Sequence, residues 1–360
     1  MPDLEMYRNQ ERHMSKRIAI FGAGAAGSYI GAFLTREGHD ITLIDMWGEH
    51  VEAMRENGLR VSGSQGDFTV PVNALHLSDA MQIQGKFDIA FLAMKSYDTE
   101  WSAHFLKRLI ASDGVVVDSQ NCMNDQLIAS IVGYGREVGC VMSGITVALW
   151  EPGHVTRGGQ PGHTVFRVGE LHGKITPRVE EIVEILSCID GAIATENIWG
   201  ERWSKLTTNS SGNPVGAMTD LGSYGVASNS DARRIQINIC KESCQVALAQ
   251  NYRVEPIRGI AAETYAKADD GGVYEELDAK FQPGPAGGAD WKSSMGQDVL
   301  KGRHTEVEFM NGYISAQGRA SGVPTPINDA IVQIVSEIDS GTRKPSPENI
   351  AAVLRMAGMA

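Results

Sequence analysis

The sequence lacks several features that would place it in whole classes of protein. Its 360 residues contain no apolar run near the roughly eighteen residues that a membrane span needs. Lysine and arginine number 32 against 44 aspartates and glutamates, a net charge of −12, whereas a nucleic-acid binder needs a basic face. The first residues have mixed charges and no apolar stretch, so no signal peptide is expected there. We therefore expect a cytoplasmic protein that has neither a nucleic acid nor a membrane as partner.

Cysteine and histidine are too sparse and scattered to indicate a metal centre. The five cysteines form no CxxC pair, and the nine histidines form no HExxH pattern. Cys240 and Cys244 could supply half of a site from one helix, but no second half follows at ligand spacing. We expect no metal, and reduced cysteines that pack as small core residues.

Length and pattern together predict two domains, because a domain has about 150 residues. Residues 27–37 carry apolar side chains at helical spacing. Short apolar runs typical of buried parallel strands occur at residues 17–21, 41–44, 87–94 and 115–117. Strands that alternate with helices predict an α/β fold, a Rossmann-type doubly wound parallel sheet with helices on both faces.

The second half of the sequence has a different pattern and reads mainly as helices. We predict a disordered leader at residues 1–15, a Rossmann domain at 16–195, a helical substrate and catalytic domain at 196–335 and a C-terminal extension at 336–360. The Gly/Pro-rich residues 282–288 predict a loop within the helical domain.

A glycine-rich loop between the first predicted strand and helix fits the dinucleotide-binding pattern GxGxxG. The loop consists of Gly22, Ala23, Gly24, Ala25, Ala26 and Gly27. The first glycine permits a tight turn, the second lets a pyrophosphate approach the backbone, and the third lets the helix pack on the sheet. The start of the helix then supplies N–H groups to the phosphates. A glycine-rich turn without a ligand is the alternative.

Asp45 follows the second predicted strand, about twenty residues after the glycines, where an acid accepts hydrogen bonds from ribose hydroxyls. A carboxylate there also repels a 2′-phosphate, and no lysine or arginine follows at once. Asp45 therefore favours NAD(H) over NADP(H). The alternative is an aspartate that caps the following helix.

Lys205, Asn209 and Asn213 are spaced four residues apart and form one stripe on a predicted helix. A lysine and two asparagines are poor core residues, but they suit a polar pocket that donates a proton and binds substrate oxygens. The alternative is a solvated helix face.

A third polar stretch completes a resemblance to a known family. It contains Ser293-Ser294-Met295-Gly296-Gln297-Asp298, Gly302-Arg303-His304-Thr305-Glu306 and Asn311-Gly312. Together with GAGAAG, Lys95, Gln120-Asn121 and the tryptophan, lysine and asparagine of residues 203–209, it resembles the ketopantoate reductases (2-dehydropantoate 2-reductases). The resemblance covers residues 16 to about 328 and implies a Rossmann domain followed by a helical domain, as in these enzymes of pantothenate biosynthesis.

The resemblance also implies roles for two residues in catalysis. Lys205 corresponds to the general acid that protonates the carbonyl oxygen as hydride arrives, and the same residue is the base in the reverse direction. Glu306 corresponds to the essential acid that orients the lysine and the substrate hydroxyl. Glu308 is expected to be a surface residue.

Five further residues match binding positions of the family. Ser294 corresponds to the serine that binds the substrate carboxylate, and Asn209 and Asn213 would bind substrate oxygens. Asn121 would bridge cofactor and substrate, and Lys95 would lie at the edge between them.

The sequence departs from the family at three points. Cys122 stands where the family usually has a glycine after Gln-Asn. The loop at residues 269–290 and the tail beyond residue 336 are expected to be longer than in the shortest family members. Asp45 favours NAD where pantothenate-pathway members prefer NADP.

The sequence predicts an NAD(H)-dependent oxidoreductase that transfers hydride between nicotinamide and a small 2-oxo or 2-hydroxy acid. 2-Dehydropantoate/pantoate is the first candidate, and a homodimer is the expected assembly. An opine- or β-hydroxyacid-type dehydrogenase and a non-catalytic NAD-sensing protein are the alternatives.

Overall fold

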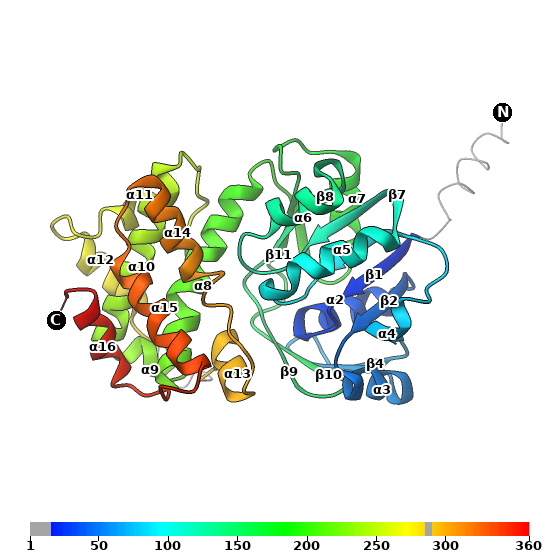
Figure 1. The fold of residues 1–360 in the computed structure, drawn as a ribbon, viewed down its shortest axis with the longest axis horizontal. Coiled ribbons are helices and arrows are strands. Elements are labelled where there is room, and N and C mark those ends of the chain that lie inside the picture. Colours follow the sequence, from blue (N-terminus) through cyan, green and yellow to red (C-terminus); the bar gives the residue numbers. More distant parts are fainter. Residues whose placement is uncertain (1–15, 285–289, 360) are drawn as a thin grey trace. The chain divides into compact units, whose positions relative to one another are not determined.

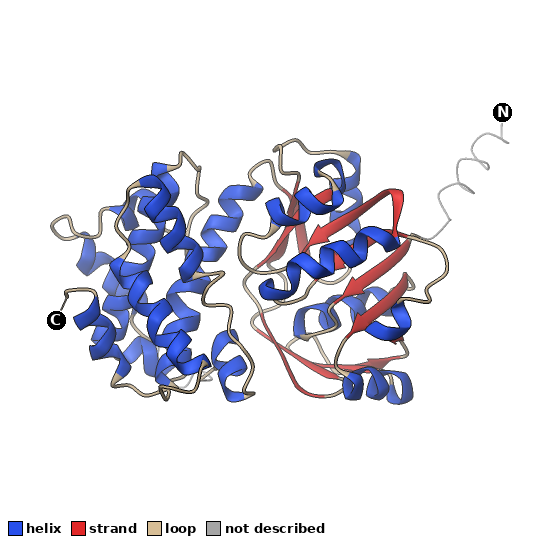
Figure 2. Ribbon diagram, viewed as in Figure 1, coloured by secondary structure: helices blue, strands red, loops and turns tan. Residues whose placement is uncertain are grey.

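The computed structural model describes residues 16–284 and 290–359. The chain divides into two compact units between Ile198 and Trp199 (Figure 1). Among the described residues every strand lies in the first unit, and the second unit is helical (Figure 2), which confirms the predicted fold class. The predicted leader, residues 1–15, and residues 285–288 of the predicted loop lie outside the described residues.

The first unit contains two β-sheets. The order of the eight-stranded sheet is β12-β11-β8-β7-β6-β1-β2-β5, and that of the four-stranded sheet is β4-β3-β10-β9. The strands of the large sheet are β1 (Arg17–Phe21), β2 (Asp40–Asp45), β5 (Asn73–His76), β6 (Phe87–Leu92), β7 (Ile110–Asp118), β8 (Glu137–Met142), β11 (Thr164–Gly169) and β12 (Gly191–Ala194). Those of the small sheet are β3 (Leu59–Gly63), β4 (Phe68–Val70), β9 (Thr146–Glu151) and β10 (His154–Gly158).

The topology of the large sheet puts its switch point beside β1. Ile20 of β1 is paired with Leu43 of β2 on one side and with Phe91 of β6 on the other, both in parallel register. The chain therefore moves outward from β1 in one direction and later returns to its other side. In doubly wound sheets ligands bind at such a switch point, outside the carboxyl ends of the strands. Two strands depart from the predicted parallel sheet, because β11 is antiparallel to β8 and the edge strand β12 is parallel to β11.

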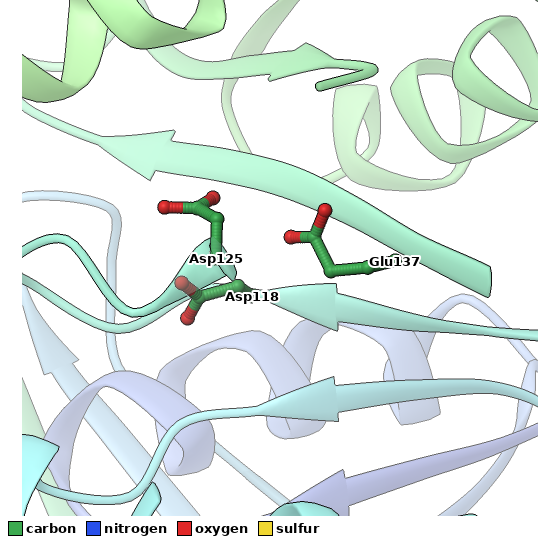
Figure 3. A group of neighbouring side chains, drawn as sticks. All are labelled: Asp118, Asp125 and Glu137. Carbon is green, nitrogen blue, oxygen red and sulfur yellow. The ribbon is translucent and has the colours of Figure 1, made fainter. Parts of the chain in front are cut away.

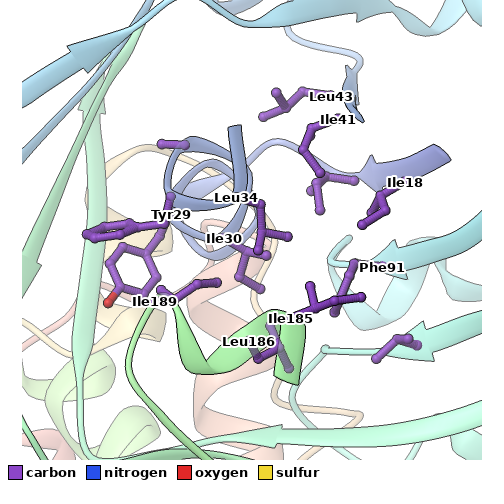
Figure 4. Close-up of a cluster of buried hydrophobic side chains, with 14 of the residues drawn as sticks. Ile18, Tyr29, Ile30, Leu34, Ile41, Leu43, Phe91, Ile185, Leu186 and Ile189 are labelled. Carbon is purple, nitrogen blue, oxygen red and sulfur yellow. The ribbon is translucent and has the colours of Figure 1, made fainter. Parts of the chain in front are cut away.

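Helices cover both faces of the large sheet because its central strands are apolar on both sides. In β1, Ile18 and Ile20 belong to one buried cluster (Figure 4), and Ala19 and Phe21 belong to the other. Helices α2 and α7 contribute to the first cluster, and α5 and α6 to the second. The helices of this unit are α2 (Ala25–Arg36), α3 (Gly48–Asn57), α4 (Leu77–Ala80), α5 (Thr99–Leu109), α6 (Asp125–Val132) and α7 (Pro177–Ser187), with short 3-10 helices η1 (Ser96–Asp98) and η2 (Tyr134–Arg136).

The small sheet is an addition that the sequence did not indicate. It packs on α2, the helix that follows the glycine-rich loop. Phe33 of α2 contacts Phe68 of β4 edge-to-face, with ring centroids 5.1 Å apart. Helix α2 is therefore held between two sheets, which fixes the loop at its N-terminal end.

A buried ion pair ties the small sheet to the edge of the large one. Arg157 Nη2 lies 2.5 Å from Asp190 Oδ2, and the two side chains are 0% and 2% exposed. Gln65 donates to Asp190 Oδ2 at 3.1 Å and accepts the hydroxyl of Tyr29 at 2.6 Å. Burial raises the pKa of Tyr29 to about 12, so its hydroxyl remains protonated as a donor.

The second unit is a packed set of helices with its own core. Cys240 and Cys244 lie in this core beside Tyr265 and Phe281. Burial raises the pKa of Cys240 to about 11 and that of Cys244 well above its ordinary value, which disfavours the thiolate form that binds metals. The helices are α8 (Ile198–Thr219), α9 (Ser223–Ser228), α10 (Ser230–Ala249), α11 (Ala262–Ala266), α12 (Val273–Phe281), α13 (Ser294–Leu300), α14 (Asn311–Ser321), α15 (Pro326–Asp339) and α16 (Asn349–Met356).

Two sequence predictions for this unit are modified. The predicted loop at residues 269–290 contains helix α12, so that prediction was wrong for its middle part. Helix α15 runs through residue 336, where the C-terminal extension was expected to begin. Residues beyond α15 fold back, and Asn349 Nδ2 donates to the carbonyl of Met218 at 2.8 Å. The C-terminal residues up to 359 thus belong to the second unit. None of the helices in residues 16–284 and 290–359 has the length and apolarity that crossing a membrane requires.

Replacing Asp190 tests the buried ion pair. Asp190→Asn should lower the free energy of unfolding by about 3–5 kcal/mol, because it leaves the Arg157 charge buried without its partner. Asp79→Asn, in the exposed pair between Arg55 and Asp79, should cost less than about 1 kcal/mol. Urea denaturation of both variants measures the difference, and equal losses would contradict the assignment.

Candidate active site

The glycine-rich loop follows β1 and has the close backbone contacts that its glycines permit. Gly22 has φ +99°, and a Cβ there would lie 2.8 Å from the backbone of Ala93 and Met94. A Cβ on Gly27 would lie 1.9 Å from the carbonyl oxygen of Gly22. Gly24 instead borders open space, with no atom within 4 Å of a Cβ position. This loop fits the pyrophosphate of a dinucleotide, because the backbone is exposed at the second glycine.

Lys95 and Asn121 lie in the loops that follow β6 and β7, next to the glycine-rich loop. The amide of Gln120 donates to the carbonyl of Met94 at 2.9 Å. Asn124 donates to the Ser96 hydroxyl at 3.2 Å and to the carbonyl of Asn121 at 2.9 Å. These bonds hold the two loops together at the carboxyl edge of the sheet.

Cys122 explains why its position usually holds a glycine in the family. It has φ +73°, in the left-handed region that glycine adopts without steric cost. The side chain is buried, 3% exposed. The turn therefore keeps the conformation of a glycine although the residue carries a Cβ.

Asp45 ends β2, the strand beside β1. Its Oδ1 accepts the N–H of Trp47, the N-cap residue of α3, at 2.8 Å. The carboxylate thus supports the start of α3, in line with the capping alternative, and this bond fixes its direction at the sheet edge. Arg55 of α3 forms ion pairs with Glu52 and Asp79, in which its Nη1 lies 2.7 Å from Glu52 Oε1 and its Nη2 lies 2.7 Å from Asp79 Oδ2.

The polar stripe of Lys205, Asn209 and Asn213 lies on α8 and is half-buried at all three positions. Neighbouring positions such as Leu206 and Ser210 are fully buried. A solvated helix face would be exposed, so this pattern favours a polar pocket over that alternative.

Pro214 leaves one carbonyl of α8 without its helical donor. A helix pairs the carbonyl of residue i with the N–H of residue i+4, and proline has no N–H. The carbonyl of Ser210 therefore lacks a backbone donor. Asn311 Nδ2, at the start of α14, donates to this carbonyl at 3.2 Å. A side chain from a helix 101 residues away replaces the missing backbone donor.

The side chain of Asn311 is held in place by a buried chain of hydrogen bonds. Asn311 also donates to Asn328 Oδ1 at 2.9 Å, and Asn328 donates to Glu242 Oε2 at 2.7 Å. Glu242 further accepts the backbone N–H groups of Ile327 and Asn328, each at 3.0 Å. Burial raises the pKa of Glu242 to about 6.

The segment that contains Ser294 and Glu306 runs between two contacts with α8. At one end, Ser293 donates to the carbonyl of Asn213 at 2.9 Å and leaves Ser294 exposed. At the other end Asn311 binds Ser210, as described above. Glu306 lies between these contacts and is 4% exposed, whereas Glu308 is exposed, as predicted.

Asp339 of α15 anchors the residues just before Glu306. Its Oδ2 accepts the backbone N–H of Thr305 at 3.1 Å and the Thr305 hydroxyl at 2.7 Å. His304 Nδ1 also lies 3.1 Å from this oxygen. The position of Glu306 is therefore set by a residue that the sequence did not indicate.

Three buried carboxylates, Asp118, Asp125 and Glu137, form a further polar cluster in the first unit (Figure 3). Their oxygens lie within 4.8 Å of one another. Asp118 accepts the N–H of Gln120 at 2.9 Å, and all three residues take part in further interactions. Such a cluster does not by itself define a metal site.

The predicted site residues thus form one group in each unit. Four adjacent strands of the large sheet, β2, β1, β6 and β7, end at or shortly before Asp45, Gly22, Lys95 and Asn121, respectively. The polar stripe, Ser294 and Glu306 lie on α8 and on the segment beside it. The structural roles of Asn311 and Asp339 were not identified from the sequence, although Asn311 belongs to the Asn311-Gly312 part of the family motif. The internal proline of α8 was a second signal for Asn311, whereas no sequence pattern indicated Asp339.

Comparison with known proteins identifies the family. The profile "Ketopantoate reductase PanE/ApbA" matches residues 18–170, and "Ketopantoate reductase PanE/ApbA C terminal" matches residues 197–339. The 2-dehydropantoate 2-reductase of Archaeoglobus fulgidus is 30% identical over 334 residues, which cover 91% of this chain and 99% of that protein.

Solved structures share the fold. A PanE/ApbA family ketopantoate reductase from Ralstonia eutropha has a TM-score of 0.74 and 26% identity, covering 91% of this chain and 99% of that one. A ternary complex of D-mandelate dehydrogenase with NADH and anilino(oxo)acetate has a TM-score of 0.76 and 24% identity, covering 90% of this chain and 98% of that one. At that identity the second likeness concerns the fold alone.

The glycine-rich loop on a doubly wound sheet and the helical second unit define a nucleotide-dependent oxidoreductase. The chain belongs to the ketopantoate reductase family, as its sequence resemblance predicted, and it is an NAD(P)-dependent oxidoreductase of that type.

The link between Pro214 and Asn311 can be tested with a double-mutant cycle. Asn311→Ala should lower the free energy of unfolding by about 1–3 kcal/mol, because it leaves the buried Ser210 carbonyl without a donor. In a Pro214→Ala background the backbone N–H returns, so the same change should cost less. A coupling of about 0.5 kcal/mol or more by urea denaturation is expected, and strict additivity would show that the two residues act separately.

Proposed function

We propose that this chain reduces a small 2-oxo acid, 2-dehydropantoate being the first candidate, with NADH as the preferred reductant and Lys205 as the general acid. The name of the Archaeoglobus relative supports the substrate, since the two chains align over nearly their whole length. The family match over both units favours this function over an opine-type dehydrogenase or a non-catalytic NAD-sensing protein. A homodimer remains a prediction.

The observation that carries the proposal is the half-buried polar stripe on α8, beside a segment with a buried glutamate. Lys205 is one turn from Asn209 and two turns from Asn213 on the same face. Glu306 is buried in the segment that contacts α8 at Asn213 and Ser210. An ammonium, two amides and a carboxylate are thus gathered in one unit, a combination that neither a core nor a solvated surface favours.

These side chains match the charges that carbonyl reduction creates. When bound, the nicotinamide supplies a hydride to the carbonyl carbon. Negative charge then develops on the carbonyl oxygen, where the Lys205 ammonium would stabilise it and transfer a proton. Glu306 would orient that ammonium, and Asn209 and Asn213 would hold substrate oxygens. Ser294 would bind the substrate carboxylate, while Lys95 and Asn121 would lie where nicotinamide and substrate meet.

Substitution of Lys205 tests the proton donor. Lys205→Ala should lower kcat by roughly 10²–10⁴, the usual contribution of general acid catalysis, with little change in the Kd for NADH. Lys205→Arg should not restore activity, because a guanidinium keeps its proton at neutral pH. Steady-state kinetics and an NADH fluorescence titration measure the two effects. A fully active Lys205→Ala enzyme would remove Lys205 from the mechanism.

The two neighbouring glutamates provide a matched control for this experiment. Glu306→Ala should reduce kcat about as strongly as Lys205→Ala, whereas Glu308→Ala should leave the kinetics nearly unchanged. Comparable losses in both variants would indicate a general disturbance of the segment and no specific role for Glu306.

The choice of nucleotide is a separate prediction that rests on Asp45. NADH should be preferred over NADPH by at least about tenfold in kcat/KM, which requires only about 1.4 kcal/mol. Asp45→Ala should narrow the ratio, since it removes both the ribose acceptor and the charge that repels a 2′-phosphate. Kinetics with both nucleotides test this, and equal use of NADPH by the wild-type enzyme would defeat it.

A further inference from the structure

We propose that His50 is a positioning residue for the glycine-rich loop, where it holds the peptide between Ala23 and Gly24 so that the Gly24 N–H faces the dinucleotide phosphates. The inference rests on the proposed nucleotide site at residues 22–27. It assigns a role to a residue outside the GxGxxG pattern.

His50 lies in α3 and is fully buried at 0% exposure. The N–H of Gly153 donates to His50 Nδ1 at 2.8 Å, and Nε2 lies 2.8 Å from the carbonyl oxygen of Ala23. A backbone amide can only donate and a carbonyl can only accept. The proton of the ring is therefore on Nε2, and the imidazole is neutral and donates to Ala23.

Two side chains converge on the carbonyl of Ala23. The Ser28 hydroxyl of α2 donates to the same oxygen at 2.6 Å, and its Oγ lies 3.2 Å from His50 Nε2. In a trans peptide the C=O and the following N–H point in opposite directions. Because the carbonyl is held toward His50 and Ser28, the Gly24 N–H is turned away from them.

The position of Gly24 makes this orientation of its N–H suitable for binding a phosphate. Gly24 borders open space and is the N-cap of α2, where N–H groups are available to an anion. An outward Gly24 N–H is a donor for a phosphate oxygen, and a peptide that could rotate would lose this preorganisation.

His50 also contacts the residues around Asp45, the acid proposed to bind the ribose. Trp47 donates its N–H to Asp45, and its ring stacks on His50 with centroids 5.4 Å apart. Gly153 lies in the turn between β9 and β10, so the small sheet contributes a hydrogen bond to the arrangement. One buried histidine thus connects the glycine-rich loop, the acid after β2 and the added sheet.

Two amide substitutions, His50→Asn and His50→Gln, separate the contributions of the two ring nitrogens. Glutamine can place an amide N–H near Nε2 and keep the donor to Ala23, whereas asparagine is too short and can only replace Nδ1. His50→Asn should raise the Kd for NADH about tenfold, the worth of one hydrogen bond at the upper end of the usual range. His50→Gln should recover most of that loss. His154→Asn, which alters the same hairpin away from the loop, is the control and should not change the Kd.

Fluorescence titration with NADH gives the Kd, and thermal unfolding monitors the fold of each variant. In turnover the KM for NADH should rise in His50→Asn while the KM for the oxo acid stays constant, a split that a general loss of structure would not produce. If His50→Asn does not fold, Ser28→Ala removes the other donor to the same carbonyl and should shift the Kd in the same direction. Wild-type affinity in folded His50→Asn, or equal losses in the asparagine and glutamine variants, would overturn the proposal. A wild-type protein that binds neither NADH nor NADPH would refute the nucleotide site itself and this inference with it.

Discussion

The hydrogen bond from Asn311 to the carbonyl of Ser210 is the contact on which the polar interior of the second unit depends. Pro214 creates the need for it, since it removes one donor from the ladder of α8. The bond places the start of α14 against the helix that carries Lys205, Asn209 and Asn213. Asn328 and Glu242 extend this contact to α15 and α10. Buried polar groups thus fix the position of α8 relative to α14, α15 and α10.

The two units use the same device at their candidate sites. In each, a buried side chain holds one backbone carbonyl, His50 for Ala23 and Asn311 for Ser210. Both carbonyls belong to segments whose other backbone or side-chain groups would contact cofactor or substrate. A buried carbonyl has a strong requirement for a donor, so each contact defines one backbone geometry sharply. Precision at the sites thus derives from hydrogen bonds made behind them.

Much of the first unit could be predicted because its central strands are buried on both faces. Such strands appear as continuous apolar runs, as residues 18–21 and 89–92 do. The small sheet gave no such signal, since strands such as β3 and β4 are short and partly exposed. Helix α12 was missed because glycines precede it and a Gly/Pro-rich stretch follows it.

The site was predictable where chemistry follows from spacing along one element. The four-residue spacing of the polar stripe is a property of a single helix, and the glycine pattern is a property of a single turn. The role of His50 depends instead on a carbonyl 27 residues earlier and an amide 103 residues later. Those partners are set by the packing of α3 on β2 and β5 and beside Gly153, which no local pattern encodes.

Cys122 shows how a family pattern and a physical requirement can separate. The turn after β7 requires a left-handed backbone, which glycine meets through the lack of a side chain. Here a buried cysteine adopts it, at a steric cost of about 1 kcal/mol. At this position the chain therefore adopts a left-handed backbone angle with a residue other than glycine. A search that demands glycine after Gln-Asn would pass over this chain, whereas one that scores the backbone angle would retain it.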